Sequence, residues 1–86
     1  MAASMRPRVT RDEEDNLRAR LSQQIDQARR GSARAAADAA GLMAQLGMFD
    51  GPAAARRRYV FARWTEGVDP DVASEGWAIW LARGGR

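Results

Sequence analysis

Apolar and small residues recur every seven positions along the first half of the chain. Two series, offset by four positions, carry this period: Leu21, Ala28, Ala35, Leu42 and Phe49, and then Ile25, Ser32, Ala39 and Leu46. Residues with this spacing fall on one stripe of a helix, as the a and d positions of a coiled coil do. The pattern therefore predicts a long N-terminal helix over about residues 11–46.

The start of this helix is marked by its own chemistry. Thr10 and Glu13 form a Ser/Thr-x-x-Glu capping box, in which each side chain bonds the backbone amide of the other residue. Residues 12–15 are all acidic, and acids in a first turn stabilise the positive end of the helix dipole. Because consecutive helical positions point about 100° apart, these four carboxylates do not converge on a metal ion.

Gly31 and Ser32 leave the continuity of the helix open. Glycine commonly ends a helix and serine commonly begins one, so the pair favours a break that would fold the two halves onto each other. Against a break, the seven-residue register continues through the pair, and a glycine inside a helix costs only about 1 kcal/mol. We therefore expect one helix, whose length of about 54 Å exceeds the diameter of a compact 86-residue domain and calls for a partner.

The second half of the chain predicts two short helices. Pro52 suits the first turn of a helix over about residues 52–66. Asp69 and Pro70 mark the start of a last helix over about residues 70–83. We expect an all-α fold in which both short helices pack back on the C-terminal half of the long one. The expected core consists of Leu42, Met43, Leu46, Phe49, Val60, Phe61, Trp64, Ile79, Trp80 and Leu81.

The length of 86 residues limits the chain to one domain. Residues 1–9 are small and basic and contain a proline, so we expect a disordered basic arm followed by a single helical domain over residues 10–86. No apolar run resembles a signal peptide or a membrane span, which favours a cytoplasmic protein with no membrane partner. The abundance of alanine, arginine and glycine without lysine is typical of a GC-rich bacterial or phage genome.

The composition excludes most enzyme chemistry. The chain has no cysteine, histidine or lysine, and all 14 of its basic residues are arginine. Arginine is not deprotonated in proteins, so it supplies neither a general base nor a Schiff-base amine. Most side chains that enzymes use near neutral pH are therefore missing. We expect a protein that is not an enzyme, with no catalytic residue, no metal site, no cofactor and no small-molecule substrate.

The expected core is thin. Leucine, isoleucine, valine and phenylalanine make up 13 of the 86 residues, or 15%, below the roughly 20% under which folding of a chain comes into question. Small cores without disulfides or metals are commonly stabilised by association. The function indicated is a protein-binding module, as a regulatory, adaptor or accessory subunit or as a homo-oligomer. The predicted association surface consists of Leu21, Ile25, Ala28, Ala35 and Ala39.

Two further features have a functional and a structural interpretation each. Arg56, Tyr59 and Arg63 share one helical face that could bind phosphates and stack on a base, so nucleic-acid binding is the alternative function. The structural interpretation of this face is a solvated surface. Trp77 and Trp80 are a candidate apolar hot spot for a partner, or else part of the core.

Overall fold

The computed structural model describes residues 10–85, so the predicted basic arm, residues 1–9, lies outside the described residues. Within residues 10–85 the chain is helical and contains no strand, which confirms the all-α class. The elements are α1 (Arg11–Arg29), α2 (Ala33–Gln45), the 3₁₀ helix η2 (Gly51–Arg56), α3 (Arg57–Trp64) and α4 (Pro70–Ala82).

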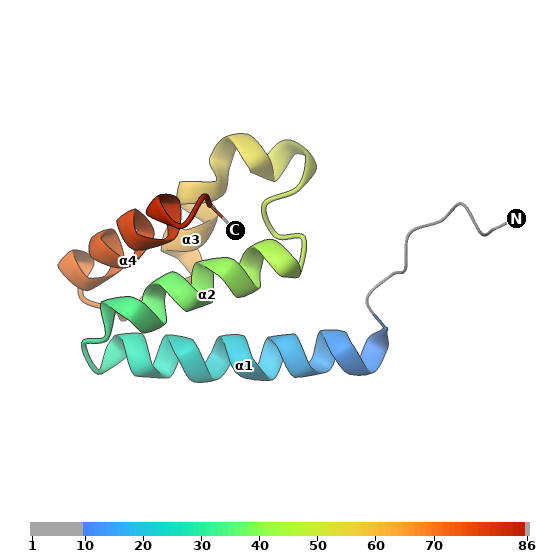
Figure 1. The fold of residues 1–86 in the computed structure, drawn as a ribbon, viewed down its shortest axis with the longest axis horizontal. Helices are drawn as coiled ribbons and strands as arrows, with labels where there is room; N and C mark the ends of the chain where they lie inside the picture. Colours follow the sequence, from blue (N-terminus) through green and yellow to red (C-terminus); the bar gives the residue numbers. More distant parts are fainter. Residues whose placement is uncertain (1–9, 86) are drawn as a thin grey trace, which may run out of the picture.

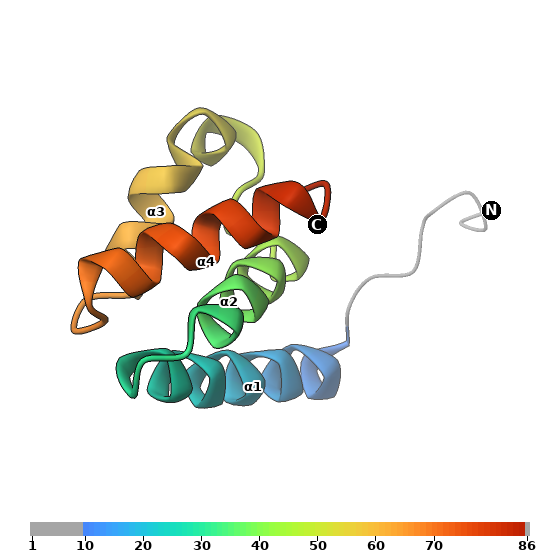
Figure 2. The same ribbon diagram turned by 60° about the vertical axis from the view of Figure 1, so that its left-hand side comes forward.

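The central element is α2. It lies between α1 on one side and α4 on the other, and both views show this order (Figures 1 and 2). The helix α3 follows η2 and crosses beside α4, while its last residue, Trp64, reaches the flank of α1. The packing of α4 on α2 confirms the prediction that the late helices pack back on the first half of the chain.

The starts of α1 and α4 lie where the sequence signals predicted them. The Thr10 hydroxyl accepts a hydrogen bond from the Glu13 amide at 3.1 Å, and the Thr10 amide donates to the Glu13 carboxylate at 3.0 Å. The amide of Thr10, and then its hydroxyl, lower the pKa of Glu13 below its ordinary value because they stabilise the carboxylate. The Asp69 carboxylate caps α4 in the same manner by accepting from the Asp71 amide at 2.8 Å.

The prediction of a continuous first helix is wrong, because the chain breaks at Gly31. The backbone there has a φ of +105°, a left-handed conformation that glycine adopts readily. The Gly31 amide donates to the Ala28 carbonyl and the Ser32 amide donates to the Gln27 carbonyl, which is the Schellman pattern of helix ends. The Ser32 hydroxyl then accepts from the Ala35 amide at 3.0 Å and caps α2. Both helix ends are thus satisfied locally, as in the alternative that folds the two halves onto each other.

The five residues predicted as an association surface are buried inside the chain. None is more than 7% exposed, because α1 and α2 turn these positions toward each other. The seven-residue spacing therefore reflects the contact between the two halves of this stretch and not a surface offered to a partner. The small side chains at these positions permit α1 and α2 to approach each other closely. These core positions are Leu21, Ile25 and Ala28 of α1, and Ala35 and Ala39 of α2.

Replacing Gly31 with alanine should lower the free energy of unfolding by about 1–2 kcal/mol. No atom lies within 4 Å of the position of the new Cβ, so the cost is the strain of the left-handed backbone alone. Urea unfolding followed by circular dichroism measures the difference. The control is Gly31→Asn, which should lose less because asparagine visits this conformation more readily. A Gly31→Ala protein as stable as the wild type would contradict the structural role of the break.

Most of the expected core is found, with two exceptions. The buried or half-buried members are Leu42, Met43, Leu46, Phe49, Val60, Phe61, Ile79 and Trp80. Trp64 and Leu81 are 44% and 42% exposed, so the prediction that they belong to the core is wrong. Alanines of α2 fill the core in their place, because their small side chains let α1 and α4 approach α2 from both sides. The fully shielded ones include Ala36, Ala37 and Ala40.

Candidate functional site

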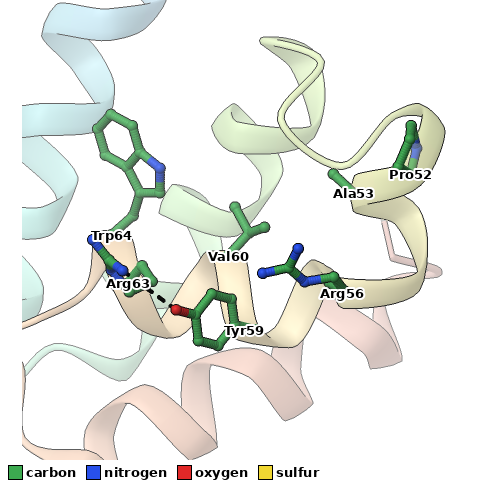
Figure 3. A pocket seen from close by; sticks show the side chains of 7 residues that line it. All are labelled: Pro52, Ala53, Arg56, Tyr59, Val60, Arg63 and Trp64. Atoms are coloured by element: carbon green, nitrogen blue, oxygen red, sulfur yellow. Dashed lines mark hydrogen bonds between the residues drawn. The ribbon is translucent and has the colours of Figure 1, made fainter.

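A groove lies on the exposed side of η2 and α3 (Figure 3). This α3 groove encloses about 370 Å³ and is lined by Pro52, Ala53, Arg56, Tyr59, Val60, Arg63 and Trp64. The predicted face of Arg56, Tyr59 and Arg63 is therefore brought together, because residues three, four and seven positions apart lie on the same side of a helix. The face forms although residues 51–56 are a 3₁₀ helix and not the first turns of the predicted α-helix.

Tyr59 orients both arginines of this groove. The guanidinium carbon of Arg56 lies 5.1 Å from the centroid of the Tyr59 ring, and Nη1 of Arg63 donates to the Tyr59 hydroxyl at 3.3 Å. Figure 3 shows the two guanidiniums on either side of the ring. The hydrogen bond to Tyr59, and then the nearby Glu66 carboxylate, raise the pKa of Arg63 above its ordinary value. Arg63, like any arginine, is cationic at neutral pH, and its hydrogen bond places the guanidinium beside the Tyr59 ring.

Trp64 separates the α3 groove from a second one. This α1–α3 groove encloses about 230 Å³ and is lined by Arg18, Leu21, Ser22, Ile25, Asp26, Arg29 and Trp64. The Trp64 side chain lines both grooves and remains 44% exposed, while Tyr59 beside it is 51% exposed. Trp64 thus belongs to the surface of the site, which is a role that the sequence had not assigned to it.

The arginines of the α1–α3 groove are already paired. Arg18 lies 3.1 Å from the Glu14 carboxylate, and Arg29 lies 3.4 Å from the Asp26 carboxylate. Arg29 also donates to the backbone carbonyl of Glu66 at 3.1 Å, which ties the end of α3 to α1. Exposed pairs of this kind contribute about 0–1 kcal/mol each to stability. Their main effect here is to neutralise the charge of the arginines on the α1 side of Trp64.

Trp77 and Trp80 do not form an exposed hot spot. Trp80 is buried and Trp77 is half-buried, so the interpretation as part of the core holds. The guanidinium of Arg57 lies 5.4 Å from the Trp80 ring and 5.8 Å from the Trp77 ring, and that of Arg58 lies 5.7 Å from the Trp77 ring. These cation–π contacts cover part of the two rings.

Within residues 10–85 no three carboxylates are grouped to hold a metal ion, and no helix there is long and apolar enough to cross a membrane. No family model, curated protein or solved structure matches the chain, so its function has to be inferred from its own residues. The site offers two exposed aromatic rings, Tyr59 and Trp64, and two arginines that Tyr59 contacts.

Proposed function

We propose that the chain is a non-enzymatic protein-binding module, acting as a regulatory, adaptor or accessory subunit. It contacts its partner through the α3 face, defined as Arg56, Tyr59, Arg63 and Trp64. The observation that carries the proposal is the exposure of two large aromatic side chains, Tyr59 and Trp64, on one short helix, with an arginine on either side of Tyr59. Tryptophan, tyrosine and arginine are the residue types that dominate binding hot spots.

The way in which α3 is packed supports this proposal. Phe61 is the residue that α3 buries in the core, and the rings of Tyr59 and Trp64 stay in contact with water. Apolar surface removed from water contributes about 25 cal/mol per Å². A partner that covers both rings therefore gains free energy that the isolated chain leaves unused.

Replacing Trp64 with alanine should weaken the partner complex by about 30-fold or more, the effect of losing a hot-spot residue. The immobilised full chain captures partners from an extract of its source cells, and the captured protein is then titrated against each variant. Leu81→Ala is the matched control, because Leu81 is equally exposed but lies on α4, outside both grooves. Circular dichroism confirms that both variants fold. A partner that binds Trp64→Ala as tightly as the wild type would contradict the proposal.

Nucleic-acid binding is the second candidate. The observation that favours it is the pair of guanidiniums on either side of the exposed Tyr59 ring. Phosphates would bind Arg56 and Arg63 and a base would stack on Tyr59, with the arginines of residues 1–9 adding further contacts. Such binding should fall steeply between low and moderate salt. A chain that binds neither single-stranded DNA nor RNA at low salt would remove this candidate.

A further inference from the structure

The segment that forms the α3 groove is strongly basic. Residues 51–66 contain four arginines and one glutamate, a net charge of +3, which equals the formal net charge of the whole chain. The other charges of the sequence therefore balance, and the excess of positive charge lies in η2 and α3. A localised charge of this kind favours a partner of the opposite sign and suppresses partners of the same sign.

The two grooves differ in what already neutralises their arginines. Arg18 and Arg29, in the α1–α3 groove, lie within 3.4 Å of carboxylates of their own helix. Arg56, in the α3 groove, pairs with no carboxylate among residues 10–85, and Arg63 reaches Glu66 only at 3.9 Å. The capacity to bind a further anion therefore lies on the Arg56 side of Trp64.

We propose that the α3 groove binds an acidic segment of a protein partner, with carboxylates on Arg56 and Arg63 and a neighbouring apolar side chain against Trp64. This inference rests on the proposed protein-binding function and specifies the chemistry of the partner. Tyr59 holds both guanidiniums in place by stacking and by a hydrogen bond. Because they are already ordered, the arginines lose little conformational freedom when a carboxylate binds.

The arrangement also gives the bound segment a direction. On the far side of Trp64, the α1–α3 groove has paired charges, and Leu21 and Ile25 line its base. That end accepts apolar side chains and has no free cation for a carboxylate. The acidic part of the segment thus lies over Arg56 and the apolar part points toward α1.

The same positions favour a carboxylate over a phosphate backbone. A nucleic-acid strand needs a row of cations, but the row that begins at Arg56 ends at Arg63. Beyond it lie two carboxylates, that of Glu66, 3.9 Å from Arg63, and that of Asp26 in the next groove. Two carboxylates of a peptide need no more than two guanidiniums, whereas a strand would continue over these acids.

The test is a selection from a display library of random twelve-residue peptides. The immobilised full chain is the bait, and peptides that still bind Trp64→Ala are removed. The selected peptides should carry acidic residues next to a leucine or an aromatic residue. In titrations of a selected peptide, Arg56→Gln and Arg63→Gln should each weaken binding about tenfold, as expected for the loss of a charge-assisted hydrogen bond. Arg20→Gln is the control, because Arg20 is an exposed arginine that lines neither groove beside Trp64.

Three other outcomes would overturn the inference. Trp64-dependent peptides without acidic residues would contradict the acidic partner and leave the proposed protein-binding function standing. A selection without any Trp64-dependent peptide would contradict both. Binding of a twelve-nucleotide single-stranded DNA more tightly than any selected peptide, with loss of binding in Arg56→Gln and Arg63→Gln, would assign the groove to nucleic acid.

Discussion

Replacing Phe61 with alanine is expected to lower the free energy of unfolding by about 3–5 kcal/mol, the range for large aromatic residues in cores. Phe61 is fully buried, and within Arg57–Trp64 the structure buries no other residue. Its ring lies 4.9 Å from that of Trp77, and the guanidinium of Arg58 covers it at 5.4 Å. Truncation to alanine leaves a cavity under α3 and removes the side chain that fixes this helix to the core.

Urea unfolding followed by circular dichroism measures this loss. Phe61→Leu is the matched control, because it keeps most of the buried volume and should cost less than about 1.5 kcal/mol. The peptide titrations then distinguish a residue that supports the groove from one that contacts the peptide. Phe61→Ala should lose stability and binding together, whereas Trp64→Ala should lose binding with a smaller change in stability. A loss of stability below about 1 kcal/mol in Phe61→Ala would show that α3 is held in place by other contacts.

Helix starts were predictable from the sequence because their chemistry is local. The Thr10–Glu13 capping box and the Asp69–Pro70 start each depend on residues within one turn, and both helices begin where these signals place them. The same argument explains why the face of Arg56, Tyr59 and Arg63 was found. Spacing along one helix decides which side chains share a side, and no tertiary contact is needed to predict it.

The break at Gly31 could not be decided in this way. A seven-residue register places apolar residues on one stripe of each half, whether or not the halves form one helix. The register therefore does not identify what covers the stripe. The difference between the two alternatives is the burial of α1 against α2, a tertiary contact that the spacing along the chain does not reveal.

The exposure of Trp64 was missed, and the choice between core and surface for Trp77 was left open, for a similar reason. Val60, Phe61 and Trp64 span about 100° of the helix surface, and the spacing alone does not show which edge of that stripe faces the core. The structure buries Phe61 and leaves Trp64, the last residue of α3, exposed at the border of the groove. Trp77 of α4 is covered by Arg57 and Arg58 of α3. This is a contact between two helices, so the spacing along one helix does not predict it.

Replacing Gly76 with alanine is expected to cost about 2–3 kcal/mol and to lower the melting temperature by roughly 8–24 °C. In an exposed helix the same exchange would stabilise the protein by about 1 kcal/mol, because alanine is the better helix former. Gly76 is buried where α4 crosses α2. A Cβ at this position would overlap the Cβ of Ala36, lie 2.8 Å from the carbonyl oxygen of Ala33 and lie 3.0 Å from the amide nitrogen of Ala37. Two of these three atoms belong to the backbone, so the helices have to separate.

Thermal unfolding of three further proteins tests this explanation. Ser74→Ala, at an exposed position of α4, should leave stability within about 0.5 kcal/mol of the wild type. Ala36→Gly in the Gly76→Ala background should recover part of the loss, because it removes one close contact and keeps the two with the backbone; Ala36→Gly alone completes the double-mutant cycle. A Gly76→Ala protein as stable as the wild type would contradict the close crossing of α2 and α4. Trp77 follows Gly76 and supports the ring of Phe61, so a forced shift of α4 should also loosen α3 and weaken peptide binding.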